Sequence, residues 1–142
     1  MAPMVKLVCF LKRKDGLTLD EFYEHWLGHH APLIRSTPAL ARHVVRYEQH
    51  KRVPEPSWCG TPGYDGITVQ WFTSVDEFVA FTAEPKYAEL IEPDEATFLD
   101  RDAFVWMITE EPIVAMDGPI DGAGANAVDQ AQADLGGEWD EP

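Results

Sequence analysis

Side chains that can carry protons or bind metal ions crowd into one short stretch near the N-terminus. His25 and His29 are four residues apart, and Glu21 precedes His25 by the same interval. On a helix this spacing puts the three on one face, where they could approach a metal ion together. However, the sequence has no HExxH motif and shows no further ligand beside the two histidines. We therefore expect no metal at this helix.

His30 follows directly and falls on the buried side of the same helix, next to Pro32. The unperturbed pKa of histidine is near neutrality, so an imidazole that faces a cavity can move protons at working pH. The alternative is a core histidine whose ring is hydrogen-bonded to backbone. His30 is the first candidate for a catalytic acid or base.

Three more polar residues are candidates for the same site. Tyr47 could orient an oxyanion or a phenol, and His50 could act as an acid or base. In an undistorted strand these two point to opposite faces, so only one of them can face a cavity. Asp94 lies in an acidic segment; buried beside a histidine, it would hold the tautomer of the imidazole. Core, surface and turn-capping roles remain the alternatives.

Six elements are predicted to position these residues. Thr18 with Glu21, and Ser74 with Glu77, have the spacing of a capping box and mark the starts of two helices. Pro32 should kink or end the first helix. Strands are expected over residues 5–11, 42–50, 66–72 and 103–109. The order βαββαβ predicts an α+β, ferredoxin-like fold, with a four-stranded antiparallel sheet and two helices on one face.

The other face of this sheet also carries apolar side chains. Burying them is favourable at about 25 cal/mol per Å², and nothing else in the chain can cover them. We therefore expect a homodimer in which two sheets pack face to face, with a cavity between sheet and helices.

Charge and composition exclude several classes of partner. The chain of 142 residues has 11 lysines and arginines against 25 acidic residues, a net charge of −14. This surplus of negative charge disfavours binding to nucleic-acid phosphates or to an anionic membrane surface. No apolar run approaches the length of a membrane-spanning helix, and no signal-peptide pattern opens the chain. With only two cysteines, we expect a reducing, cytoplasmic setting.

The chain divides into a body, residues 1–116, and an acidic C-terminal tail, residues 117–142. The tail holds seven acidic residues, no lysine or arginine, and few large apolar groups. Such a segment buries too little to offset its ordering entropy, which predicts a flexible, solubilising tail. The alternative is that Leu135 and Trp139 dock on a partner subunit.

Residues 5 to about 110 resemble the EthD-like family. The first helix carries the family's pattern of an aromatic residue, a ring, a tryptophan and then a histidine followed by Ala-Pro-Leu. The later segments 47–50, 64–67, 71–74, 94–95 and 98–100 match as well. The residues that carry the helix pattern are Phe22, His25, Trp26, His30, Ala31, Pro32 and Leu33. His29 is not part of the family's pattern, and His25 stands where another aromatic ring is common.

The resemblance implies a dimeric α+β barrel and a set of residues for a catalytic cavity. Founding members accompany a haem-thiolate monooxygenase system that degrades an ether, whereas related members are cofactor-free decarboxylases or dehydratases, and others of this fold isomerise lactones or cyclise polyketides. By this resemblance His30 is the acid or base of the cavity, with His50, Tyr47 and Asp94 as its other polar wall. The pocket that excludes water would be formed by Phe10, Trp26, Trp71, Phe72 and Trp106.

The leading hypothesis is therefore a cofactor-independent acid/base enzyme, a decarboxylase, dehydratase or isomerase acting on a small hydrophobic or aromatic carbonyl compound. The second is an accessory protein that binds such a compound for an oxidative partner enzyme. A third is a metal or haem oxygenase.

Overall fold

A computed structural model describes residues 3–54, 57–59 and 63–118, so the predicted acidic tail lies almost wholly outside the described residues. Its centre is one antiparallel sheet with the strand order β2-β3-β1-β4. The register sets Cys9 of β1 opposite Thr68 of β3 on one side and Trp106 of β4 on the other. The strands are β1 (Val5–Leu11), β2 (Arg46–Lys51), β3 (Gly66–Phe72) and β4 (Val105–Thr109).

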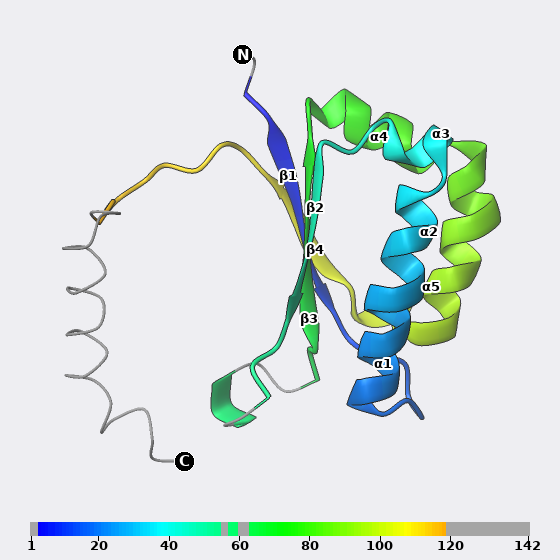
Figure 1. The fold of residues 1–142 in the computed structure, drawn as a ribbon. Helices are drawn as coiled ribbons and strands as arrows, with labels where there is room; N and C mark the ends of the chain where they lie inside the picture. The colour runs from blue at the N-terminus through cyan, green and yellow to red at the C-terminus, as the bar shows by residue number, and fades with distance from the viewer. Residues whose placement is uncertain (1–2, 55–56, 60–62, 119–142) are drawn as a thin grey trace.

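All the α-helices lie on one face of this sheet (Figure 1). The predicted α+β, ferredoxin-like fold is confirmed, including the four-stranded antiparallel sheet. The α-helices are α1 (Leu19–His25), α2 (Ala31–Arg35), α3 (Pro38–Ala41), α4 (Val75–Ala83) and α5 (Glu92–Phe98). Short turns of other types are η1 (Trp26–His30), η2 (Ser57–Cys59), η3 (Tyr87–Ile91) and η4 (Arg101–Ala103).

The two helix starts were predicted correctly, but only one has a complete capping box. At α1 the Thr18 hydroxyl accepts from the Glu21 backbone N–H at 3.1 Å, and the Glu21 carboxylate accepts from the Thr18 N–H at 2.9 Å. At α4 Ser74 accepts from the Glu77 N–H at 3.1 Å. The carboxylate of Glu77 instead meets His43 Nδ1 at 2.7 Å. The half-buried imidazole of His43 thus binds the carboxylate that a complete capping box would have used.

Pro32 does not break the first helix. The turn before it, η1, widens to π-helical geometry, and the Ala31 N–H bonds to the Trp26 carbonyl. Pro32 has no N–H to donate to the Gly28 carbonyl, so the regular α-helical hydrogen bond at this point is lost in any case. A wider, π-helical turn here therefore loses few further hydrogen bonds. The chain repeats this arrangement at η3, which precedes Pro93 in α5. Both π-helical turns lie next to residues of the candidate site.

Two strands begin later than predicted. Residues 42–45 follow the short helix α3 as a turn, and β2 starts at Arg46. Leu40 in α3 is fully buried, which fixes this helix against the core and delays the strand. Before β4, the turn η4 occupies residues 101–103.

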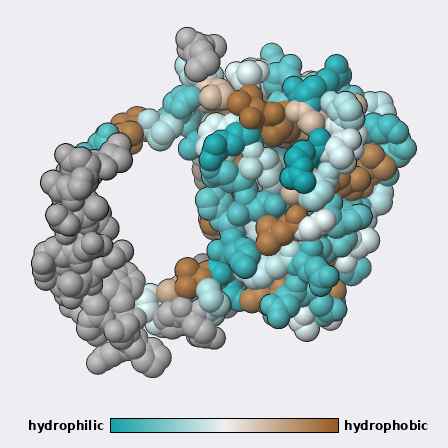
Figure 2. Space-filling model, viewed as in Figure 1, coloured by the Kyte–Doolittle hydropathy of each residue, from teal (hydrophilic) through white to brown (hydrophobic). Residues whose placement is uncertain are grey.

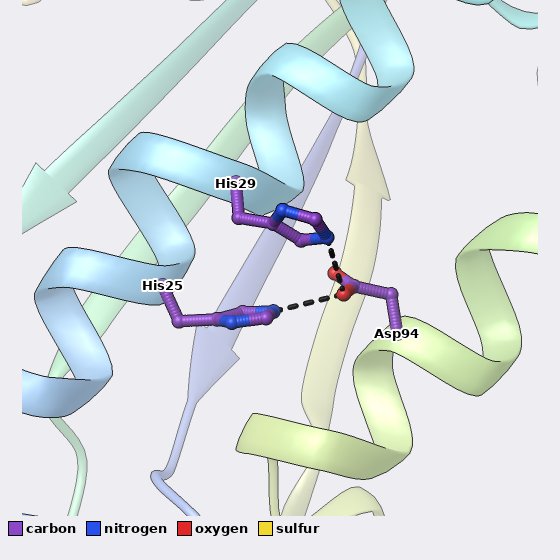
Figure 3. A group of neighbouring side chains, drawn as sticks. All are labelled: His25, His29 and Asp94. Atoms are coloured by element: carbon purple, nitrogen blue, oxygen red, sulfur yellow. Dashed lines mark hydrogen bonds and ion pairs between the residues drawn. The ribbon is translucent and has the colours of Figure 1, made fainter.

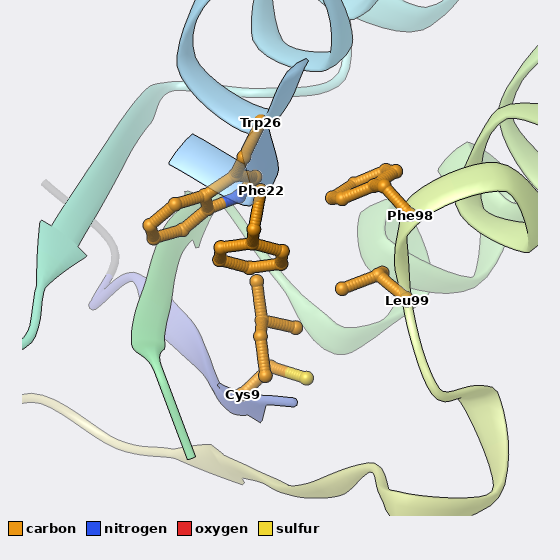
Figure 4. Close-up of a cluster of buried hydrophobic side chains, with 6 residues drawn as sticks. Cys9, Phe22, Trp26, Phe98 and Leu99 are labelled. Atoms are coloured by element: carbon orange, nitrogen blue, oxygen red, sulfur yellow. The ribbon is translucent and has the colours of Figure 1, made fainter. Parts of the chain in front are cut away.

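The core beneath the helices is dominated by aromatic side chains. Figure 4 shows Phe22 and Trp26 from the first helix meeting Phe98 and Leu99 from the end of α5, above Cys9 of β1. The Phe22 ring centroid lies 5.5 Å from that of Trp26 and 5.7 Å from that of Phe98. These contacts fix the first helix and α5 relative to each other, and each of these two helical segments supplies part of the site.

The opposite face of the sheet is open in the single chain. Phe10, Val105 and Met107 on this face are 39%, 52% and 62% exposed. The surface seen in Figure 2 is mostly hydrophilic, with scattered hydrophobic patches. Among the described residues, no helix is long and apolar enough to cross a membrane.

Candidate functional site

A cavity of about 160 Å³ lies between the sheet and the helices. Most of its wall is apolar, and its few polar groups come from the first helix, β2, β3, α4, η3 and α5. Such a mixture is typical of small-molecule sites. Its lining includes Cys9, Leu11, Trp26, His30, Ile34, Tyr47, Thr68, Gln70, Phe81, Tyr87, Ile91, Glu95, Leu99 and Trp106.

His30 is a buried polar group in this wall, 7% exposed. Its Nδ1 lies 2.7 Å from Asp94 Oδ2, a contact between the first helix and α5. The Phe98 ring packs against the imidazole at a centroid distance of 5.0 Å. Within the described residues, Nε2 of His30 makes no hydrogen bond. The imidazole is therefore held at one nitrogen, and the other is left for a molecule in the cavity.

The environment of His30 favours its neutral form. Burial lowers the pKa of the imidazole below its ordinary value, and the hydrogen bond to Asp94 offsets this only in part. A carboxylate only accepts hydrogen bonds, so Nδ1 carries the proton and Nε2 carries the lone pair. This is the arrangement of a general base that is oriented by an acid.

The structure decides between Tyr47 and His50. Tyr47 pairs with Gln70 on the helix side of the sheet and lines the cavity, where burial raises the pKa of its hydroxyl. The hydroxyl is close enough to Thr68, Trp26 and Gln49 for each to stabilise its ionised form in part. The buried indole N–H of Trp26 nevertheless has no hydrogen-bond partner at ordinary distance. A polar ligand atom beside Tyr47 would find two donors.

His50 does not lie in this cavity. It pairs with Ile67 on the open face of the sheet, its side chain is 52% exposed, and it lies 2.9 Å from Glu48. The prediction that it shares a polar wall with His30 fails on placement, because β2 runs without a bulge and alternation sends it to the other face.

Two of the five residues predicted for the aromatic pocket, Trp26 and Trp106, line the cavity. Phe10 and Trp71 lie on the open face, where Trp71 packs against Lys6 and Arg46. Phe72 is fully buried in a second core cluster and does not line the cavity. The strands carry apolar side chains on both faces, so the sequence did not indicate which face would line a cavity.

Glu95 is a polar residue of the cavity that sequence reasoning missed. It follows Asp94 on α5, and successive helix residues point about 100° apart, so Asp94 meets the first helix while Glu95 lines the cavity. Burial raises the pKa of the Glu95 carboxyl to about 7, although Arg101 and a hydrogen bond from Tyr87 lower it in part. The cavity thus holds a carboxyl group that is partly protonated at neutral pH.

Asp94 also faces two histidines on the outer side of the first helix. Its Oδ1 lies 2.8 Å from His25 Nε2 and 3.3 Å from His29 Nε2 (Figure 3). These two nitrogen atoms and one oxygen atom lie within 4.8 Å of one another, so they could be ligands of one metal ion. Glu21 has its carboxylate in the capping box instead.

Comparison with known proteins agrees with this fold. The model of the EthD domain matches residues 14–102. No curated protein matches the chain. An EthD-like protein from Ralstonia eutropha is 19% identical, with a TM-score of 0.59 over 82% of this chain and 98% of that one.

Two further structures show the same fold. A dimeric protein of unknown function with a ferredoxin-like fold, from Bacteroides fragilis, is 15% identical, with a TM-score of 0.56 over 75% of this chain and 95% of that one. A hydroxynitrile lyase from Passiflora edulis is 13% identical, with a TM-score of 0.50 over 82% of this chain and 99% of that one. Since the EthD model spans well over half of the sequence, the chain belongs to the EthD family.

Proposed function

We propose that this protein is an acid/base enzyme that acts on a small hydrophobic or aromatic carbonyl compound with its own side chains. The observation that carries the proposal is the position of His30. Its ring lines an apolar cavity, and its Nδ1 is held by Asp94 at 2.7 Å. A buried histidine whose Nδ1 is oriented by a carboxylate, and whose Nε2 has no hydrogen-bond partner among the described residues, suits proton transfer better than structural support.

In this proposal Nε2 of His30 removes a proton from the carbon next to a carbonyl group. The electron pair moves onto the carbonyl oxygen, which needs hydrogen-bond donors as charge develops there. Tyr47, with the Trp26 indole N–H nearby, supplies them. The carboxyl of Glu95, in its protonated form, is a third donor in the same cavity. The imidazolium then returns its proton to another carbon, which gives isomerisation, or to a β-hydroxyl that departs as water, which gives dehydration.

The size of the cavity narrows the substrate class. A dry cavity of about 150 Å³ can hold a benzene-sized molecule. The cavity here, at about 160 Å³, thus fits one ring or a short branched chain. Its apolar lining, which includes Ile34, Phe81 and Leu99, would exclude water from the reacting atoms.

Two comparisons lend this proposal support. The Passiflora protein is a hydroxynitrile lyase, so a protein of this fold can be an enzyme, although 13% identity shows only a shared fold. The dimeric relative from Bacteroides fragilis is consistent with the predicted homodimer. We propose that the open face of the sheet packs on that of a second copy.

A deuterium-exchange screen tests the proposal. Single-ring and short-chain ketones, β-keto acids and β-hydroxy ketones are incubated with the protein in D₂O, and exchange or conversion is followed by NMR. We expect turnover of at least one compound, and a fall of about 10²- to 10⁴-fold in His30→Gln. The matched control is His43→Gln, because His43 bonds to Glu77 and Glu84 away from the cavity.

Thermal unfolding of each variant checks that the fold is intact. Undiminished turnover in a folded His30→Gln variant would overturn the proposal. Saturable binding of these compounds with no exchange or conversion would also overturn it, in favour of an accessory protein that carries a substrate for an oxidative partner enzyme.

A further inference from the structure

A second constellation, separate from the cavity, lies on the outer side of the helical layer. His25 and His29 project from consecutive turns of the first helix, and Asp94 reaches toward them from α5 (Figure 3). The Nε2 atoms of the two histidines and Oδ1 of Asp94 lie within 4.8 Å of one another. None of the three residues lines the cavity that holds His30.

The separations of these atoms approach those of a metal shell. Two bonds of about 2.0–2.1 Å at a tetrahedral angle put their donor atoms about 3.3 Å apart. His29 Nε2 lies 3.3 Å from Asp94 Oδ1, which equals that separation. His25 Nε2 lies 2.8 Å from the same oxygen, in a hydrogen bond, and needs a shift of about half an ångström to open the shell.

The carboxylate is already oriented for such a role. The Asp94 side chain is 7% exposed, and its other oxygen, Oδ2, is fixed by His30 at 2.7 Å. Ligating groups in metal sites are commonly held in this way by a hydrogen bond from an outer partner. Asp94 Oδ1 is thus presented at a fixed position, with both histidines beside it.

The site is open to solvent on one side. The His29 side chain is 60% exposed, and the surrounding surface hollow is lined also by Glu24, Gly28 and Thr97. A bound ion would therefore keep one or more water ligands. Thr97 Oγ1 lies 3.5 Å from His25 Nε2 and could compete with an ion for this nitrogen. Its hydroxyl, however, already donates to the Asp94 carbonyl at 2.6 Å.

We propose that His25, His29 and Asp94 form a binding site for a divalent transition-metal ion, with Zn²⁺ as the ion that fits best. Two imidazoles and one carboxylate are borderline ligands that suit Zn²⁺, Ni²⁺ or Cu²⁺, whereas Ca²⁺ and Mg²⁺ need shells made mostly of oxygen. The sequence pointed away from a metal because only two ligands were in view; the fold brings the third from 65 residues further along the chain.

The proposal does not depend on any catalytic activity, so binding itself is the test. Zn²⁺ is titrated into tag-free, chelator-treated protein by calorimetry, in a Cys59→Ser background because that thiol is exposed. We expect one saturable equivalent per chain, and an affinity at least about tenfold weaker in His25→Ala and in His29→Ala. His50→Ala is the matched control, because His50 is an exposed histidine outside the cluster.

Cobalt gives an independent spectroscopic readout. Co²⁺ bound by two imidazoles and a carboxylate should show visible d–d absorption in the parent protein and in His50→Ala, and none in the His25→Ala/His29→Ala double variant. Added Zn²⁺ should also raise the melting temperature in a concentration-dependent way, and the double variant should lose this effect. The absence of a saturable equivalent, or an affinity unchanged in the double variant, would overturn the proposal.

Discussion

Asp94 Oδ2 lies 2.7 Å from His30 Nδ1, and both side chains are buried. The contact joins two helical segments that are far apart in the sequence, and each has a π-helical turn beside it, η1 ending at His30 and η3 ending at Ile91. His30 and Asp94 are 7% and 8% exposed, so water competes little for the contact between Oδ2 and Nδ1. The imidazole is thereby fixed in one tautomer at the wall of the cavity.

Asp94→Asn should abolish most of the turnover of whatever substrate the screen identifies. An asparagine can offer its amide N–H₂ to Nδ1, which shifts the proton of the imidazole to Nε2 and removes the lone pair from the cavity. We expect a fall in kcat of about 10²-fold or more. The measurement is made with a chelator present, so that metal binding does not contribute.

The matched control is Asp100→Asn, since Asp100 pairs with Lys12 at the surface and does not line the cavity. A kcat for Asp94→Asn equal to that of this control would show that the contact between Asp94 and His30 is only structural.

Glu95→Gln should change how stability depends on pH. Because the pKa of Glu95 is raised from 4.5 to about 7 in the folded chain, the free energy of unfolding falls as pH rises from 4.5 to 7 and stays lower above 7. Glutamine keeps a similar shape and removes this loss. At pH 8 the variant should be more stable than the parent by roughly 1–3 kcal/mol, and below pH 4 the advantage should disappear.

Urea unfolding at pH 4, 6 and 8 measures this difference. Glu92→Gln, an exposed acid on the same helix, serves as the comparison. A stability difference between Glu95→Gln and the parent that does not vary with pH would mean that folding does not raise the pKa of the Glu95 carboxyl.

Gly66→Ala should destabilise the fold. A Cβ at this position would lie 2.7 Å from the Trp26 ring and 3.1 Å from the carbonyl oxygen of His50. Trp26 is fully buried and cannot move aside without disturbing the aromatic core. Overpacking of this kind costs about 1–3 kcal/mol. Denaturant unfolding measures it, and Gly28→Ala is the control, because a Cβ there meets nothing within 4 Å.

Met107→Asp should weaken the proposed homodimer. Met107 is 62% exposed on the open face of the sheet, opposite Val8 in the register, so a carboxylate there would be buried between two sheets. Sedimentation velocity should show a dimer for the parent and mostly monomer for the variant at micromolar concentration. Val79→Asp, on the exposed side of α4, should leave the dimer intact. A monomeric parent chain would refute the predicted assembly.

Sequence patterns sufficed for the fold because each element carried its own signals. Thr18 with Glu21 marked the start of α1, and alternation in residues 66–72 gave β3 its observed bounds. The start of β2 was predicted too early. Burial of Leu40 holds α3 and the turn after it against the core, and this packing is a tertiary effect that strand propensity does not show. The open face, with Phe10 and Met107, could be read as apolar from the sequence, whereas its packing on a second copy stays a prediction.

The site could be predicted only in part. His30 and Trp26 stand at helical spacing on the buried side, so both were found at the cavity. The choice between Tyr47 and His50 needed the register of β2 against β3, which local sequence does not give. Glu95 was missed because the sequence does not give the rotation of α5 about its axis. That rotation turns Glu95, and not the adjacent Asp94, toward the cavity.

The protonation of His30 tests the central claim most directly. ¹⁵N-NMR of histidine-labelled protein distinguishes the two tautomers, and His30→Gln assigns the signals. At neutral pH we predict protonated Nδ1 and unprotonated Nε2 at His30, with the Nε2 shift responding when a single-ring carbonyl compound is added. A proton on Nε2, or an Nε2 signal indifferent to every compound that binds, would contradict the account.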